Sequence, residues 1–272
     1  TRNWIHQCAA FTGSSITTYF DCSSPTCTGT TSSLMNWPQI AFPFVYLGTS
    51  GTERSFYGWF SEVRLYKKAL TPAEVFAVRS YAGTTAFSVN EGSALLAYYP
   101  FNPSNIYADA SGNGYTLSAV NAAYPPTYDS SVAPPFPGAG VALLDNNGVN
   151  DNSGLGKSFQ VNVGAGLDLR EPVGTEAAPG QGFTVCFWYR AKDGATAGTV
   201  NAVNWQPIVV FARFNALRGS APFHYYDRVR YIRGLGSTPD MYWDLYGPTN
   251  VVQMVTLSGK FSRISGALAI AG

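Results

Sequence analysis

The sequence predicts an all-β protein, with two antiparallel sheets packed as a sandwich and one short helix near residues 72–81. Aromatic residues make up 15% of the 272 residues, and aromatic side chains favour strands. Short apolar segments recur along the chain between clusters of glycine, proline, asparagine and serine, which is typical of strands joined by turns. No apolar run approaches the roughly 18 residues of a membrane-spanning helix.

The composition excludes several classes of partner. Charged residues make up only 12% of the chain and the net charge is +1, so there is no basic footprint for nucleic acid and no acidic tail. The chain opens on Thr1 rather than Met and has no signal peptide, so we expect a processed chain or an excised segment. Four cysteines and an uncharged polar surface predict an extracellular location, secreted or on a cell-surface appendage.

The first strands are expected in the N-terminal third of the chain. Residues 4–11 (WIHQCAAF) and 16–21 (ITTYFD) read as a hairpin, and residues 40–48 (IAFPFVYLG) as a further strand. Cys22 and Cys27 are expected in a loop rich in serine, threonine and proline. Residues 23–33 and 125–137 are candidates for O-linked glycans, although ordinary loops are the simpler interpretation.

Residues 56–82 predict a strand followed by a helix. Phe60, Val63 and Leu65, with Tyr66, place apolar side chains on both faces of the strand. Thr71-Pro72-Ala73-Glu74 is a capping box with proline at the first helical position.

A linker is expected at residues 83–92, and the remaining strands follow it. Residues 121–154 are rich in proline, glycine, asparagine and aspartate and predict long loops. The strand candidates are residues 95–102, 157–169, 183–190, 208–214, 225–233, 241–246 and 251–257.

Two stretches carry a family resemblance. Residues 56–82 (FYGWFSEVRLYKKALTPAEVFAVRSYA) resemble the last strand and terminal helix of laminin-G-like domains, although Ser61 replaces an aspartate of that pattern. Residues 95–117, with LLAYYPFN and ADASGNGYTL, resemble the opening of the same domains. The resemblance implies a concanavalin A-like, pentraxin-related jelly roll in permuted order, in which residues 93–272 hold the N-terminal part and residues 1–82 the C-terminal part.

Three arrangements fit a permuted order. The chain closes on itself, or it is one period of a covalent tandem array, or neighbouring protomers exchange halves. An incomplete half exposes strand edges that favour pairing with another chain. Exchange that does not close produces an open filament.

The cysteines allow three pairings, and the residues alone do not choose between them. Cys22 and Cys27 are close enough to close a local loop, and four unpaired thiols are a further alternative. In pentraxins a disulfide joins the two strands that resemble those of Cys8 and Cys186, so the resemblance implies a Cys8–Cys186 disulfide.

No catalytic pattern is recognised. The glutamates lack useful partners in the sequence, and neither histidine lies in a nucleophile or zinc motif. His6, within the first strand, is expected to be a satisfied structural residue. The six glutamates concerned are Glu53, Glu62, Glu74, Glu91, Glu171 and Glu176.

Calcium is the one cofactor that the resemblance suggests. Asp109 and Asn113 of the DASGNG loop are the best ligands, with Asp145, Asn147 and Asp151 as a second set. The simpler interpretation of both loops is turn chemistry, in which the aspartate and asparagine side chains bind their own backbone.

Glycan binding is a further hypothesis. Residues 225–233 (YYDRVRYIR) alternate aromatic and cationic residues, and Tyr225, Arg228, Arg230 and Tyr231 are the candidates for an aromatic platform. The simpler interpretation is a solvated strand face with arginine stacked on tyrosine.

Together these observations predict a non-catalytic extracellular structural protein that self-associates into a fibre, appendage or adhesive matrix. Low charge favours this because little like-charge repulsion opposes packing of identical subunits. The alternative is a lectin-like carbohydrate-binding module, with or without calcium.

Overall fold

The computed structural model describes residues 3–11, 15–33, 44–49, 56–83, 94–144, 156–163, 182–191, 206–212, 228–233, 241–246, 251–256 and 268–269. These residues form antiparallel strands and one short helix, so the all-β prediction is confirmed. Among them, no helix has the length and apolar character needed to cross a membrane.

The first sheet combines strands from before and after the expected linker at residues 83–92. Its members are β1 (Ile5–Phe11), β2 (Ser15–Phe20), β3 (Thr30–Ser33), β5 (Gly58–Tyr66), β6 (Leu95–Tyr99), β8 (Thr127–Tyr128), β9 (Ala142–Leu144) and β11 (Phe183–Ala191). The strand order is β3-β2-β1-β11-β5-β9-β8, and β6 also pairs with β5. β11 therefore lies between β1 and β5, although about 120 residues separate it from β5 in the sequence.

The second sheet is built in the same mixed way. Its members are β4 (Phe44–Leu47), β7 (Ser118–Ala119), β10 (Phe159–Asn162), β12 (Gln206–Ala212), β13 (Arg228–Arg233), β14 (Met241–Tyr246), β15 (Val251–Thr256) and β16 (Leu268–Ala269). The order is β16-β15-β14-β13-β12-β4-β10-β7, so β4 lies between two strands from the later part of the chain.

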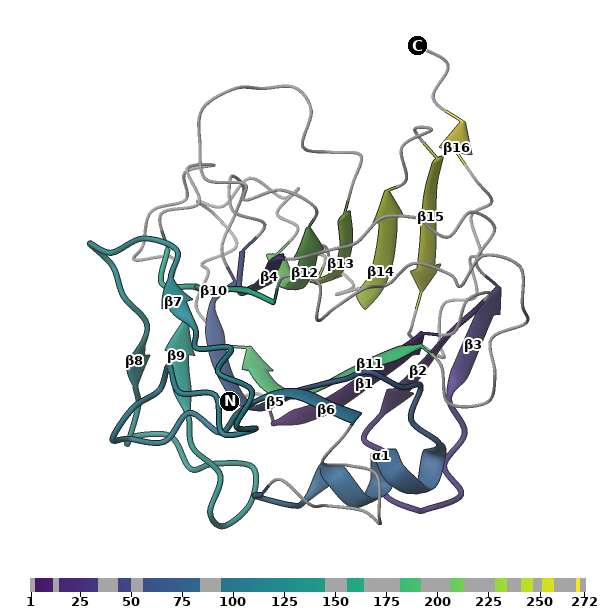
Figure 1. The fold of residues 1–272 in the computed structure, drawn as a ribbon. Helices are drawn as coiled ribbons and strands as arrows, with labels where there is room; N and C mark the ends of the chain where they lie inside the picture. The colour runs from purple at the N-terminus through teal and green to yellow at the C-terminus, as the bar shows by residue number, and fades with distance from the viewer. Residues whose placement is uncertain are drawn as a thin grey trace.

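The two sheets enclose one apolar core (Figure 1). Val45 and Phe159 reach it from the second sheet, and Phe60, Val185 and Phe187 reach it from the first. Each such side chain contributes about 1.5–3 kcal/mol when it is removed from water. Burial of this shared core is what holds the two sheets together.

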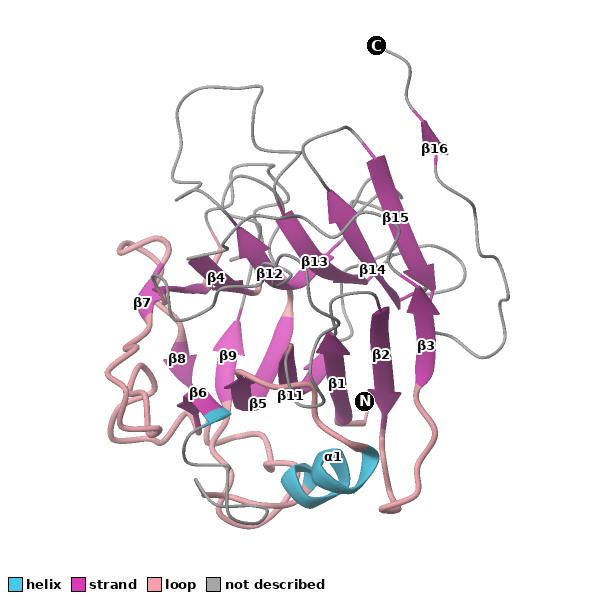
Figure 2. Ribbon diagram, turned by 45° about the vertical axis from the view of Figure 1, so that its right-hand side comes forward, coloured by secondary structure: helices cyan, strands magenta, loops and turns pink. Residues whose placement is uncertain are grey.

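The outer face of the first sheet is also covered. Helix α1 (Pro72–Arg79) lies against it, on the side away from the second sheet (Figure 2). Val75 and Val78 of α1 pack with Tyr66 and the two cysteines Cys8 and Cys186 of the sheet. Because both faces are covered, every residue of β5 is buried, as its apolar pattern predicts.

The predicted capping box of α1 is present. The Thr71 side chain accepts a hydrogen bond from the Glu74 backbone N–H, and the Glu74 carboxylate accepts one from the Thr71 N–H at 2.9 Å. These bonds satisfy amide groups that the first turn of a helix otherwise leaves without partners. The helix consequently begins at the residue that the sequence predicts.

A β-bulge in β5 changes which residues face α1. Glu62 adopts a left-handed backbone conformation with φ 53°, and the register with β11 shifts at this point. Ser61 is opposite Trp188 and Arg64 is opposite Cys186, so the bulge places two residues that are three apart on the same face. Polar side chains thereby gather beneath α1.

Most predicted strands are present, with ends that differ by a few residues. Within residues 121–154, predicted as loops, the described part contains two short strands, β8 and β9, which extend the edge of the first sheet. β3 likewise occurs where a loop was predicted, and residues 108–117 form a loop. Short edge strands have too few residues to show a period, which explains why they were missed.

The expected linker at residues 83–92 lies almost wholly outside the described residues, which resume at residue 94. Within the described chain, strands before and after this stretch pair with each other in both sheets. The two parts thus share a core and do not form two separate units.

Candidate functional site

The disulfide between Cys8 and Cys186 joins the two parts of the chain. Cys8 on β1 is directly opposite Cys186 on β11, with Cα atoms 4.1 Å apart, and their residue numbers differ by 178. Both residues are buried beneath α1. The covalent bond therefore fixes the register of the two central strands.

The second disulfide links Cys22 to Cys27, so all four cysteines of the chain are paired. Cys22 is buried with the residues beneath α1, and its sulfur lies 3.7 Å from the carbonyl oxygen of Pro72 in the first turn of the helix. This small loop consequently supports the start of α1.

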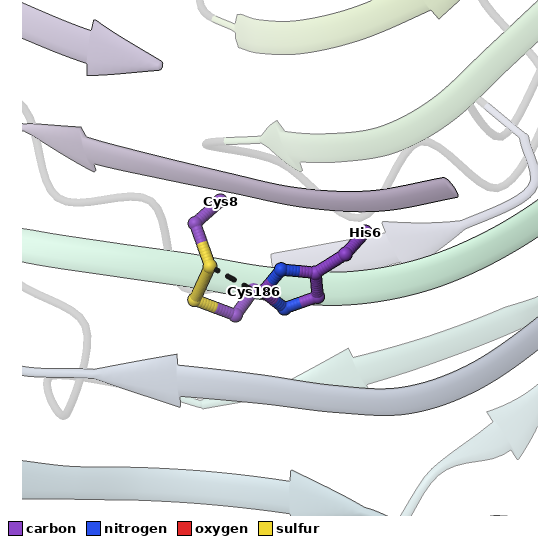
Figure 3. A group of neighbouring side chains, drawn as sticks. All are labelled: His6, Cys8 and Cys186. Carbon is purple, nitrogen blue, oxygen red and sulfur yellow. Dashed lines mark hydrogen bonds between the residues drawn. A yellow bond between two sulfur atoms is a disulfide. The ribbon is translucent and has the colours of Figure 1, made fainter. Parts of the chain in front are cut away.

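His6 lies beside the Cys8–Cys186 disulfide (Figure 3). Its side chain is 2% exposed, its Nε2 lies 3.7 Å from the Cys8 sulfur, and its ring centroid lies 5.0 Å from that of Trp188. Burial, together with the guanidinium groups of Arg79 and Arg64, lowers the pKa of His6 to about 3, so the ring is neutral at physiological pH.

His6 is buried, as a structural histidine would be, but its ring is not satisfied. Among the residues that the structure describes, its Nδ1 has no hydrogen-bond partner. Most buried polar atoms in folded proteins do have one, and an exception calls for an explanation.

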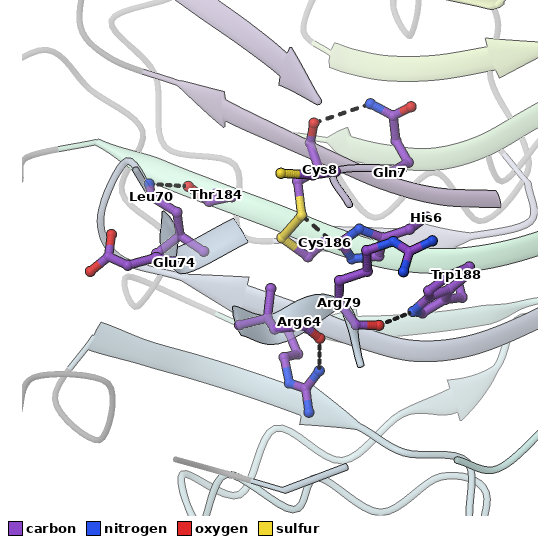
Figure 4. The surroundings of a disulfide bond; sticks show 12 residues. His6, Gln7, Cys8, Arg64, Leu70, Glu74, Arg79, Thr184, Cys186 and Trp188 are labelled. Carbon is purple, nitrogen blue, oxygen red and sulfur yellow. Dashed lines mark hydrogen bonds between the residues drawn. A yellow bond between two sulfur atoms is a disulfide. The ribbon is translucent and has the colours of Figure 1, made fainter. Parts of the chain in front are cut away.

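Arg79 covers His6 and Trp188 from α1 (Figure 4). Its guanidinium lies 5.2 Å from the centroid of the Trp188 ring, and its carbonyl accepts a hydrogen bond of 2.8 Å from Trp188 Nε1. A longer contact of 3.9 Å joins Arg79 to Asp21, which in turn accepts from the His6 backbone N–H at 3.0 Å. The end of α1 is thereby tied to β1 and β11.

Glu62, Arg64 and Tyr98 form a second buried polar cluster. Arg64 lies 3.2 Å from the Glu62 carboxylate and 4.2 Å from the centroid of the Tyr98 ring, and the Tyr98 hydroxyl donates to the same carboxylate at 2.7 Å. Burial raises the pKa of Glu62 to about 7, although Arg64 and Tyr98 oppose the shift. Burial also raises the pKa of Tyr98.

This cluster corrects the sequence analysis, which left Glu62 without a useful partner. Arg64 and Tyr98 are its partners. The available signal was a glutamate and an arginine two positions apart in an otherwise apolar strand, where both had to be buried. Tyr98 could not be assigned because it belongs to a different strand.

Arg64 also holds the segment that follows α1. Its guanidinium donates to the carbonyls of Val78 at 3.3 Å, Tyr81 at 2.5 Å and Gly83 at 2.9 Å. A guanidinium has five N–H donors in a fixed plane, so one side chain can satisfy several carbonyls at a helix end.

The expected calcium ligand Asp109 is committed to its own loop. Its carboxylate accepts from the backbone N–H groups of Tyr98, Ser111 and Tyr115 and from the Ser111 hydroxyl, at 2.9–3.0 Å. The Asn113 amide nitrogen donates to the carbonyls of two β6 residues at 2.9 Å. These contacts are the ones expected if the loop is a turn whose side chains bind its own backbone. Calcium binding by Asp109 and Asn113 stays a prediction.

The other candidate residues for calcium and glycan lie outside the described residues or in a strand described by its backbone alone. Asp145, Asn147, Asp151 and Tyr225 lie outside the described residues. In β13 the register places Arg228, Arg230 and Tyr231 opposite Tyr246, Asp244 and Trp243. The glycan platform therefore stays a prediction.

Within the described ranges, one group of three residues has the donor atoms and spacing of a metal site, namely His6, Cys8 and Cys186. Its two sulfurs are bonded to each other. The described site therefore consists of a disulfide and the buried polar side chains around it. We call it the junction, because it joins the two parts of the chain.

The fold and this junction define a class: an all-β protein of two antiparallel sheets, with a disulfide between central strands from distant parts of the chain. The chain matches no protein-family model, no curated protein and no solved structure. Its functional interpretation therefore depends on its own geometry.

Proposed function

We propose that the chain is a non-catalytic structural protein of an extracellular assembly. In this proposal the fold is a laminin-G-like, concanavalin A-like jelly roll in permuted order, with residues 93–272 as its N-terminal part and residues 1–82 as its C-terminal part. The partners are neighbouring copies of the same chain, which complete or exchange halves of the sandwich.

The observation that carries the proposal is the alternation of the two parts in both sheets. In the first sheet β11 lies between β1 and β5, and in the second β4 lies between β10 and β12. Neither part can bury the core by itself, because its central strands need neighbours from the other part. The same strand pairs can form within one chain or between two chains, which is the basis of domain exchange.

Charge and disulfides support the same proposal. A net charge of +1 with only 12% charged residues leaves little repulsion between identical subunits. Both disulfides favour an oxidising compartment, as expected for a secreted protein. The Cys8–Cys186 bond would make an exchanged contact covalent.

Isotope mixing tests the proposal directly. Unlabelled and ¹⁵N-labelled protein are unfolded under reducing conditions, mixed in equal amounts, refolded and oxidised, and then digested without reduction. If neighbours exchange halves, about half of the Cys8–Cys186 linked peptides will contain one labelled and one unlabelled partner. The Cys22–Cys27 peptide, closed over five residues, is the internal control and should contain no mixed species.

Electron microscopy and size-exclusion chromatography of the same sample complete the test. Filaments or large oligomers together with mixed peptides support the assembly. A monomer without mixed peptides overturns it and leaves a self-closed domain. Saturable glycan binding that is lost on chelation would support the lectin alternative instead.

A further inference from the structure

The cluster around the Cys8–Cys186 disulfide has a second chemical state. The ring nitrogen of His6 and the sulfurs of Cys8 and Cys186 all lie within 4.8 Å of one another, and all three residues are buried. While the disulfide is intact, the sulfurs have no thiolate to offer a metal ion. Reduction creates two thiols beside an imidazole, which are the donor types of soft-metal sites.

We infer that reduction of Cys8–Cys186 creates a site for one Cu(I) ion, bound by His6, Cys8 and Cys186. A dithiol supplies the two electrons and two protons that convert the disulfide to two thiols, and is itself oxidised to a disulfide. Cu(I) then replaces the two thiol protons, which pass to the solvent. Disulfide and metal are alternative links between β1 and β11.

The distances suit such an ion. With metal–sulfur bonds of about 2.3 Å and metal–nitrogen bonds of about 2.0 Å, taken from zinc sites, a trigonal centre places nitrogen and sulfur roughly 3.7 Å apart. The observed separation of His6 Nε2 and Cys8 Sγ is 3.7 Å. The sulfurs must separate to roughly 4 Å in the same geometry, which side-chain rotation can supply because Cys8 and Cys186 are directly opposite each other.

The number of ligands favours Cu(I) over Zn²⁺. Zinc in structural sites is almost always bound by four ligands. Among the described residues, the cluster offers three. Thiolate ligands select Cu(I) and imidazole also suits copper, and Cu(I) is stable with three ligands.

The surrounding charge fits the resulting complex. Two thiolates and one Cu(I) carry a net charge of −1, which is costly to bury alone. Arg79 and Arg64 both act electrostatically on His6 and would act on the complex in the stabilising sense. Arg64 is paired with Glu62 at 3.2 Å, whereas Arg79 has a longer contact of 3.9 Å with the partly exposed Asp21, so Arg79 is the main compensating charge.

The state of His6 provides the independent observation. Its side chain is almost fully buried, yet its Nδ1 has no hydrogen-bond partner in the described part of the chain. A histidine with a purely structural role would normally have its ring nitrogens satisfied. The other ring nitrogen, Nε2, lies 3.7 Å from the Cys8 sulfur, so the imidazole faces the two sulfurs and has no oxygen or nitrogen partner among the described residues.

The test uses a Cys22→Ala/Cys27→Ala variant, in which the only thiols after reduction are those of Cys8 and Cys186. The full-length variant is reduced with a phosphine, freed of reductant without oxygen, and titrated against Cu(I) held by bicinchoninate. We expect one Cu(I) per chain to transfer to the protein. X-ray absorption should show two sulfur ligands and one nitrogen ligand.

Two further variants, made in the same background, locate the site. Replacing both remaining cysteines by alanine should abolish transfer, and His6→Leu should remove the nitrogen ligand and weaken Cu(I) binding at least tenfold. Absence of transfer to the parent variant, or unchanged ligands and affinity in His6→Leu, overturns the inference. Circular dichroism is recorded throughout: if the reduced protein unfolds, Cu(I) should refold it, and failure to refold also overturns the inference.

Discussion

Glu62 and Arg64 form an ion pair of 3.2 Å in which both side chains are almost completely removed from water. The pair lies at a β-bulge, and Arg64 extends from it to three carbonyls at and beyond the end of α1. Desolvation of two charges is costly, so the pair is kept stable by its hydrogen bonds and by Tyr98.

Replacing Glu62 by glutamine should change how stability depends on pH. Because the folded-state pKa is raised from 4.5 to about 7, Glu62 contributes stability that is fully present below pH 4.5 and is lost as the pH rises to 7. The stability of the natural protein relative to Glu62→Gln should therefore rise by about 1.4 kcal/mol per unit as the pH falls from 7 to 4.5. Urea unfolding at several pH values measures this, and a constant difference would contradict it.

Replacing Arg64 by methionine at pH 8 should destabilise the protein by about 3–5 kcal/mol, because a buried carboxylate loses its partner. The double variant Glu62→Gln/Arg64→Met should be more stable than Arg64→Met, since no buried charge is left unpaired. Arg64→Lys should still be destabilised, because an ammonium group cannot reproduce the planar fork. Denaturant unfolding of the four proteins tests this; a double variant no more stable than Arg64→Met would be inconsistent with it.

The two disulfides should differ in their contribution to stability. Cys8–Cys186 closes a loop of 178 residues and Cys22–Cys27 one of five. The chain-entropy model assigns roughly 5 kcal/mol to the long loop and roughly 2 kcal/mol to the short one. Cys8→Ala/Cys186→Ala should therefore lose more stability than Cys22→Ala/Cys27→Ala in the monomer under oxidising conditions, and equal losses would argue against this order.

Asp109→Ala should destabilise the protein by roughly 3 kcal/mol, because several backbone N–H groups lose their acceptor. If the carboxylate acts as a loop staple, the loss will be the same with and without excess chelator. A loss that disappears in chelator would instead assign Asp109 to calcium. Thermal unfolding of both proteins under both conditions makes the comparison.

Gly140 and Gly112 allow the effect of an added Cβ to be compared at a crowded and at an open position. A Cβ at Gly140 would lie 2.2 Å from the carbonyl oxygen of Phe101, whereas at Gly112 it would meet nothing within 4 Å. Gly140→Ala should cost about 3 kcal/mol through overpacking. Gly112→Ala should cost about 1 kcal/mol, through its φ of +87° alone. Chemical denaturation of both variants checks the order, and a reversed order would show that the backbone near Gly140 yields easily.

Local features were predictable where the pattern is strong. The capping box of Thr71 and Glu74 defines the start of α1, and the apolar run around Phe60 predicts a buried strand. These signals depend on neighbours in the sequence, and hydrogen bonds within one turn or one strand determine them. The short strands β3, β8 and β9 were missed because they have too few residues to show a period, and β9 in addition pairs with the distant strand β5.

The amino-acid sequence by itself determined the all-β class, the position of the helix and the presence of four cysteines. The tertiary structure decided which strands are neighbours, that Cys8 is opposite Cys186, and that Tyr98 meets Glu62 and Arg64. The physical reason is the separation in the sequence between the residues that interact. Secondary structure depends on residues a few positions apart. Strand pairing and the burial of charge instead depend on which distant segments together enclose the core.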